Sequence, residues 1–282
     1  MKNSIFVKSI LQKTMMLCVL IIGFTTLSAQ QTATTERLLK LEKNQYFADR
    51  DSAFLDPYYG LKKLIYGNKR FAENKSIKPR QTDADLKNNE LGQKPFATII
   101  GCADSRVPNE IIFDQGVGDL FITRTAGQVM AEASYGTIEY ATEVLNTRLI
   151  VVLGHESCGA VQAAMKLPEN PPGHVVTLIN AIKPASLYAK AKGGHSHDET
   201  LDIAIRQNVI EQVDLLRGLE PVLSRRFERG EVLIVGAVYN LHTGAVEFLE
   251  ETITSLPKFI NQEKIGASVK SVSAKQVANA KK

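Results

Sequence analysis

The sequence predicts an α/β protein: a mostly parallel central β-sheet flanked by helices, with an N-terminal helical arm. Three observations predict this class. Short, strongly apolar runs recur between residues 95 and 240. Longer segments with helical spacing of apolar residues separate them. The composition, 44% hydrophobic and 23% charged over 282 residues, is that of a globular chain with a sizeable core. Alternation of strands and helices favours parallel pairing.

The first 29 residues have the layout of a secretory signal peptide. They carry three lysines and no acidic residue, then the apolar run MMLCVLIIGF (15–24), then small residues up to Ala29. This run is about half as long as the roughly 20 residues that a spanning helix needs. We therefore expect an exported protein, most simply periplasmic, with a retained anchor as the alternative. Removal of residues 1–29 would lower the formal net charge from +4 to +1, so nothing indicates nucleic acid or an anionic membrane as partner.

The mature chain divides into three parts. Residues 30–55 form the N-terminal helical arm, because 34–49 read as a polar amphipathic helix. A core domain spans 56–255, beginning with a helix at 56–73 that has Pro57 in its first turn. A polar, lysine-rich C-terminal tail covers 256–282.

The core domain contains alternating strands and helices after an irregular, charged segment at 74–92. Strands are predicted at 95–100, 119–124, 148–154 and 231–240. Helices are predicted at 131–146, 158–166 and 201–219. Residues 168–174 and 191–199 read as loops, and 244–251 as a strand or short helix. No repeat or linker divides this domain.

Cysteines follow two of the predicted strands. Cys102 comes just after strand 95–100, and His155 and Cys158 come just after strand 148–154. Parallel strands end at one edge of a sheet, where ligands bind, so neighbouring strands would bring the three side chains together. Two thiolates and an imidazole suit zinc and leave its fourth position open. The alternative is a single disulfide in an exported protein, which gives His155 no role.

Asp104 and Arg106 lie two residues apart, close after Cys102. They could form an ordinary surface ion pair of little energetic value. They could instead place a carboxylate, held by a guanidinium, beside the metal. In that position Asp104 could accept a hydrogen bond from water on the zinc, or bind the zinc itself and close the site.

Two motifs in this order resemble the β-class carbonic anhydrase family: CADSRVP (102–108) and GHESCGA (154–160). Further segments that are similar to the family in the same order are LKKLIYGNKRF (61–71), GDLFITRTAGQ (118–128), YGTIEYA (135–141) and VGAVYNLHTGAV (235–246). The resemblance covers most of residues 56–250. It implies the family's fold, a parallel sheet with helices, and an assembly as a homodimer or dimer of dimers.

The resemblance also implies the chemistry. One zinc ion per chain would be held by Cys102, His155 and Cys158, with Asp104 as a possible fourth ligand in a closed state. Asp104 and Arg106 would form the catalytic dyad. The implied enzyme is a lyase that hydrates carbon dioxide reversibly to bicarbonate and a proton, by attack of zinc-bound hydroxide.

The substrate pocket follows from the same resemblance. Gln93 matches a glutamine that hydrogen-bonds substrate across the dimer interface, and Phe121, Tyr140 and Gly159 match other pocket positions. The sequence departs from the family at Asn240, where aspartate is common. It also has no tryptophan, the residue with which some members build a second, inhibitory bicarbonate site.

Two other functions stay open at this point. A zinc hydrolase of the same fold could act on a carbon–sulfur analogue of carbon dioxide, and channel shape would distinguish it. A non-catalytic, exported protein could bind zinc or bicarbonate alone, although it would not need Asp104 and Arg106.

Overall fold

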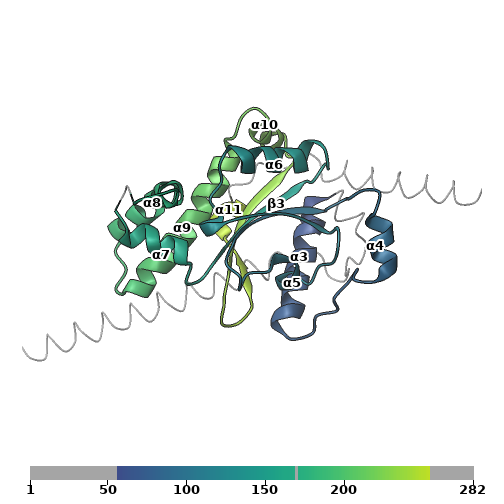
Figure 1. Ribbon diagram of the computed structural model, residues 1–282, viewed down its shortest axis with the longest axis horizontal. Coiled ribbons are helices and arrows are strands. Elements are labelled where there is room, and N and C mark those ends of the chain that lie inside the picture. The colour runs from purple at the N-terminus through teal and green to yellow at the C-terminus, as the bar shows by residue number, and fades with distance from the viewer. Residues whose placement is uncertain (1–55, 169–170, 255–282) are drawn as a thin grey trace, which may run out of the picture. The chain divides into compact units, whose positions relative to one another are not determined.

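The computed structural model describes residues 56–168 and 171–254. The helices are α3 (Pro57–Ala72), α4 (Asp83–Asn89), α5 (Asn109–Ile112), the 3₁₀ turn η1 (Ala126–Gln128), α6 (Glu132–Glu143), α7 (Gly159–Lys166), α8 (Val175–Lys192), α9 (His197–Arg217), α10 (Leu223–Glu228) and α11 (Glu250–Thr254). The strands are β1 (Ala97–Cys102), β2 (Leu120–Thr125), β3 (Leu149–His155), β4 (Leu233–Tyr239) and β5 (Val246–Phe248). Figure 1 shows their arrangement.

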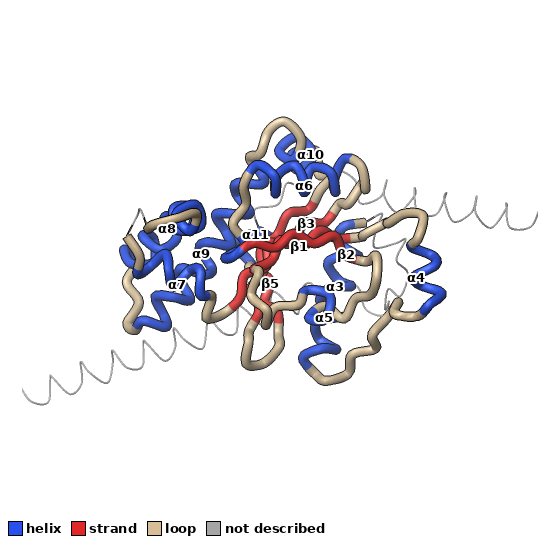
Figure 2. Tube along the Cα trace, viewed as in Figure 1, coloured by secondary structure: helices blue, strands red, loops and turns tan. Residues whose placement is uncertain are grey.

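The strands form one sheet in the order β2-β1-β3-β4-β5. The pairs β1–β2, β1–β3 and β3–β4 are parallel, and β5 pairs antiparallel with β4. Figure 2 shows the strands at the centre, with α3 and α5 on one side and α6 and α10 on the other. The predicted class, a mostly parallel central sheet flanked by helices, is confirmed. The first and third predicted strands, β1 and β3, lie side by side, which is the condition under which the residues after them can meet.

The central strands are buried along their whole length, because helices cover both faces of the sheet. On one face α9 lies close to the strands. A Cβ atom on Gly154 or Gly236 would come within 2.6 Å of a methyl group of Val209. On the other face a Cβ atom on Gly101 would come within 2.7 Å of the side chain of Asn109 in α5. Glycine at these places lets the helices approach the sheet backbone.

The four predicted strands are confirmed within two residues at each end. The prediction that residues 74–92 are irregular is wrong at α4. Thr82 and Asp85 form a capping box that starts this helix, with the Asp85 N–H donating to Thr82 Oγ1 over 3.3 Å. The loop predicted at 191–199 ends earlier than expected, because Ser196 caps α9 by accepting from the Glu199 N–H. Residues 175–192, for which no element was predicted, form α8.

The signal peptide at 1–29, the arm at 30–55 and the tail at 256–282 lie outside the described residues, so these assignments stay predictions. Within the described part of the chain, no helix combines the length and the apolar character that a membrane span requires.

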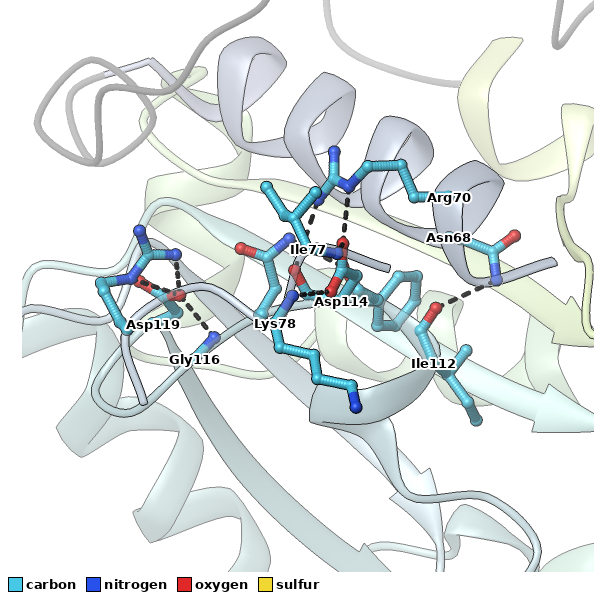
Figure 3. Close-up of polar contacts among 11 residues, drawn as sticks. Asn68, Arg70, Ile77, Lys78, Ile112, Asp114, Gly116 and Asp119 are labelled. Carbon is cyan, nitrogen blue, oxygen red and sulfur yellow. Dashed lines mark hydrogen bonds and ion pairs between the residues drawn. The ribbon is translucent and has the colours of Figure 1, made fainter. Parts of the chain in front are cut away.

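A buried carboxylate fastens the loop after α3 to the end of α5, as Figure 3 shows. Asp114 accepts hydrogen bonds from Arg70 Nε at 2.5 Å, from the Ile77 N–H at 3.1 Å and from the Lys78 N–H at 2.9 Å. Burial alone would raise the pKa of Asp114, but these hydrogen bonds hold the pKa below its usual value. The side chain of Asp114 is 2% exposed, so the ion pair is shielded from solvent.

Asp114→Asn is expected to lower the free energy of unfolding by about 3 kcal/mol at neutral pH, because it leaves Arg70 without its counter-charge. The lowered pKa means that the carboxylate stabilises the fold above its unfolded-state pKa, and that this stability is lost as the pH falls through the folded-state value. The difference between wild type and variant should therefore shrink in acid. Urea unfolding at several pH values measures it.

Glu220→Gln is the matched control, since Glu220 pairs with Arg225 at 3.1 Å but both side chains are about 60% exposed. Solvent screens this exposed pair, so the variant is expected to unfold at the same urea concentration as the wild type. Equal costs for the two variants would contradict the role given to Asp114.

Candidate metal centre

Three metal-ligating side chains meet at the carboxyl ends of β1 and β3. Cys102 is the last residue of β1, and His155 is the last residue of β3. Cys158 is the N-cap residue of α7. The two sulfur atoms and a ring nitrogen of His155 all lie within 4.8 Å of one another, and all three residues are buried. The two cysteines are free thiols, so the structure contradicts the disulfide hypothesis.

The ring of His155 is held with one nitrogen toward the thiols. Its Nδ1 lies 2.8 Å from the carbonyl oxygen of Glu156, and because a carbonyl can only accept, Nδ1 carries the proton. The Nε2 atom is therefore a lone-pair donor. It is buried and has no hydrogen-bond partner among the described residues. A buried nitrogen left in this state is costly unless an ion binds it.

The Glu156 peptide that holds this ring is itself fixed from β4. The Glu156 N–H donates to the Tyr239 carbonyl oxygen over 3.0 Å. Asn240 Nδ2 donates to the Glu156 carboxylate over 2.8 Å. An aspartate at position 240 would place a second carboxylate against Glu156. Asn240, which departs from the family's common aspartate, can instead donate a hydrogen bond to the Glu156 carboxylate.

The two thiols differ in their surroundings. Hydrogen bonding from the Cys158 thiol, together with the N–H groups of Gly127 and Asp104, lowers the pKa of Cys102 against the effect of burial. Hydrogen bonding with the Cys102 thiol, together with burial, raises the pKa of Cys158. Both thiols lose their protons when they bind a divalent cation.

Asp104 and Arg106 form a close pair beside this centre. Arg106 donates from Nε to Oδ1 over 2.9 Å and from its terminal nitrogen to Oδ2 over 2.7 Å, and its backbone N–H donates to Oδ1. The hydrogen bonds from Arg106 hold the pKa of Asp104 well below its usual range. Oδ2 of Asp104 is 3.8 Å from His155 Nε2. The pairing forms through a turn, in which the Val107 N–H donates to the Asp104 carbonyl oxygen.

Arg124 on β2 holds the backbone that carries this pair. Its Nε donates to the Cys102 carbonyl oxygen over 2.9 Å, and its terminal nitrogen donates to the Asp104 carbonyl oxygen over 2.6 Å. Gly101 pairs with Arg124 in the sheet register, which puts the guanidinium beside the strand end. No pattern in the sequence assigned Arg124 to the zinc site. An arginine at the carboxyl end of the neighbouring parallel strand was the available signal.

The predicted substrate residues do not cluster as tightly as the three metal-ligating side chains. The rings of Phe121 and Tyr140 contact each other with centroids 6.2 Å apart, and Tyr140 is 46% exposed. Gly159 is the exposed first residue of α7, next to Cys158. Gln93 is exposed in the loop before β1. Among the described residues, no hydrogen bond joins Gln93 or Gly159 to the three metal-ligating side chains.

Comparison with known proteins agrees with this geometry. The family model described as carbonic anhydrase matches residues 97–246. Carbonic anhydrase 2 of Mycobacterium tuberculosis is 42% identical over 192 residues, which cover 67% of this chain and 91% of that protein. Carbonic anhydrase of Mycolicibacterium smegmatis is 40% identical over 195 residues, which cover 68% of this chain and 93% of that protein. The solved structure of Coccomyxa β-carbonic anhydrase in complex with acetazolamide matches with a TM-score of 0.56 and 27% identity, covering 70% of this chain and 92% of that one.

The chain therefore belongs to the carbonic anhydrase family, in its β class. It is a lyase that catalyses the reversible hydration of carbon dioxide to bicarbonate and a proton, and its cofactor is zinc. The expectations drawn from the two cysteine motifs are confirmed in fold, reaction and cofactor.

Proposed function

We propose that Cys102, His155 and Cys158 hold the catalytic zinc. One observation carries this assignment: the buried Nε2 of His155 has no partner among the described residues and lies within 4.8 Å of two buried thiols. Two thiolates and one imidazole are a donor set that suits zinc. Three protein ligands leave the fourth position for the reaction.

A zinc ion held by these three residues would supply the acidity that turns water into a nucleophile near neutral pH. Asp104 stays ionised and accepts a hydrogen bond from the attacking water, which directs the water toward the substrate carbon. Arg106 donates hydrogen bonds to both carboxylate oxygens of Asp104 and so keeps Asp104 an ionised hydrogen-bond acceptor. Because those oxygens are engaged, and because Asp104 is not part of the three-residue ligand cluster, we assign the open rather than the closed state.

The substrate side of the site uses apolar surface and few polar groups, as a small, uncharged molecule requires. Phe121 and Tyr140 offer adjoining rings. Gly159 leaves the entrance free of side-chain atoms beside the zinc ligand that precedes it. Gln93 supplies an amide hydrogen bond to the substrate once a second copy of the chain brings it to the site.

The chain acts as a homodimer or a dimer of dimers. Among the described strands, β2 lies at one edge of the sheet, where another copy of the chain could pair with it. Beside it, on α6, Tyr140 is 46% exposed, and Val144 just after that helix is 64% exposed. A second copy would cover this apolar surface. Two tetrameric β-carbonic anhydrases of Sordaria macrospora have the same fold.

The chain is exported, most simply to the periplasm. The basic start, the short apolar run and the small residues before position 30 support this assignment. An enzyme in that compartment would interconvert carbon dioxide and bicarbonate outside the cytoplasm.

Zinc analysis combined with a rate measurement tests the function. We expect one zinc per chain and a rate of carbon dioxide hydration that rises with pH between about 6.5 and 9, because water bound to zinc titrates near pH 7 or above. Stopped-flow measurement with a pH indicator follows the proton released. Absence of a zinc-dependent rate throughout this range would contradict the proposal.

A further inference from the structure

A buried asparagine on α9 contacts the turn that faces the zinc site. Asn208 Nδ2 donates to the Gly127 carbonyl oxygen over 3.0 Å, across 81 residues of sequence. The Gly127 N–H in turn lies 3.3 Å from Cys102 Sγ and donates to it. We propose that Asn208 is a positioning residue of the zinc centre: it fixes Gly127 so that this N–H stays directed at the Cys102 sulfur.

Gly127 needs such a restraint because of its backbone conformation. Its φ and ψ angles are 68° and 22°, a left-handed conformation that glycine adopts freely, and Gln128 follows with φ at 47°. A Cβ atom at position 127 would lie 2.7 Å from Ile182 Cδ1 and 3.1 Å from Ala160 Cβ. Any other residue at position 127 would therefore be strained, and the hydrogen bond from Asn208 restrains the conformational freedom that glycine brings to the turn.

The two hydrogen bonds act on the two peptide planes that flank the Gly127 Cα. The N–H toward Cys102 belongs to the preceding plane, and the carbonyl bound by Asn208 belongs to the following one. With the second plane fixed, the first plane can turn away from the sulfur only by rotation about the N–Cα bond of Gly127, so fewer backbone motions break the hydrogen bond to Cys102. A backbone N–H directed at a thiolate stabilises its charge and orients its lone pairs toward the metal.

The close approach of α9 to the sheet brings Asn208 within reach of the turn. Val209, the next residue, occupies the space left by Gly154 and Gly236. Asn208 is 0% exposed and sits among apolar residues of α9 such as Ile205. Packing there would be served by an apolar side chain, and a buried amide is costly unless it is hydrogen-bonded. Among the described residues, Asn208 Oδ1 has no partner, so the bond to Gly127 is the interaction that accounts for an amide.

The test uses the full chain with Asn208→Leu, which keeps the branched shape of the side chain, and Asn208→Ser, which is too short to reach Gly127. Competition with a chelator gives the zinc dissociation constant, and cobalt substitution gives the sulfur-to-cobalt charge-transfer band. We expect zinc to bind about 10-fold more weakly in both variants, as for other residues that orient ligands. We also expect the charge-transfer band to shift in both.

Asn68 provides matched controls. It is 5% exposed and donates from Nδ2 to the carbonyl oxygens of Ile112 and Gly244, at 3.1 and 2.9 Å, so it is a buried asparagine bonded to backbone like Asn208. Asn68→Ser and Asn68→Leu should lower thermal stability but leave the zinc dissociation constant within about 2-fold of wild type, because Asn68 does not act on the ligands.

The positioning role of Asn208 rests on the assignment of Cys102 as a zinc ligand. The experiments give different results when the ligand assignment fails and when only the positioning role fails. A Cys102→Ser variant with unchanged zinc affinity would overturn the ligand assignment. If Cys102 proves necessary but the Asn208 variants match the Asn68 variants in zinc affinity and spectrum, the positioning role is overturned. Should Asn208→Leu fail to fold, Asn208→Ser alone decides the question.

Discussion

Cys158→Ser is expected to remove zinc from the enzyme and to lower the rate of carbon dioxide hydration by about 1000-fold or more. A serine hydroxyl stays protonated near neutral pH and is a poor zinc ligand, whereas Cys158 is a thiol at the start of α7. Two remaining ligands cannot hold the ion against dilution. Metal analysis of the purified variant should give below about 0.1 zinc per chain.

The same variant should lose the stabilisation that zinc confers on the wild type. An ion present at 100 times its dissociation constant adds about 2.7 kcal/mol to the free energy of unfolding. Treatment with a chelator should therefore lower the melting temperature and activity of the wild type reversibly, with no effect on Cys158→Ser. Gln162→Ala, a change within α7, is the control and should keep zinc and rate. Full zinc content in Cys158→Ser would contradict the ligand assignment.

The sequence was sufficient to predict that three side chains able to bind a metal would cluster, because each of them lies next to the end of a strand. Cys102 and His155 end the adjacent parallel strands β1 and β3, and Cys158 starts the following helix. Strand ends can be read from local apolar runs, and the edge at which parallel strands end is fixed by topology. Local apolar runs, together with the rule that parallel strands end at the same edge of a sheet, were thus enough to predict that the three residues lie close together.

The residues that hold the ligands were not predictable in this way. Asn208 acts on Gly127 from 81 residues away, and its position depends on how closely α9 approaches the sheet. Arg124 reaches the Cys102 carbonyl oxygen through the register between two strands. Such contacts depend on packing distances that no local pattern encodes. Helix α4 differs, because the capping box of Thr82 and Asp85 that starts it is a local signal in the sequence.

Arg106→Ala is expected to lower the rate by about 100-fold near neutral pH while zinc content stays at one per chain. In the wild type, the hydrogen bonds from Arg106 keep the pKa of Asp104 well below its usual range, so Asp104 does not titrate in the assay range. Without Arg106 the carboxylate remains ionised but loses its restraint. It can then enter the fourth zinc position, since Oδ2 already lies 3.8 Å from His155 Nε2.

The pH dependence of the rate of Arg106→Ala follows from competition between hydroxide and the Asp104 carboxylate for the fourth zinc position. Hydroxide displaces a carboxylate from zinc more readily as the pH rises, so the deficit of Arg106→Ala should narrow toward about pH 9. Arg106→Lys keeps the charge without the two-pronged hydrogen bond and should lose only about 10-fold. Rate profiles against pH with parallel zinc analysis measure both variants.

The matched control decides between a working dyad and an ordinary surface ion pair. Arg106 is 53% exposed and Arg225, paired with Glu220, is 62% exposed, so solvent screens both arginines to a similar degree. Arg225→Ala should leave rate, pH profile and zinc content unchanged. If Arg106→Ala behaves in the same way, then Arg106 is only a surface partner. A pH-dependent loss confined to Arg106→Ala requires that the arginine acts through Asp104 on the zinc site, because the two variants differ chiefly in which carboxylate they release.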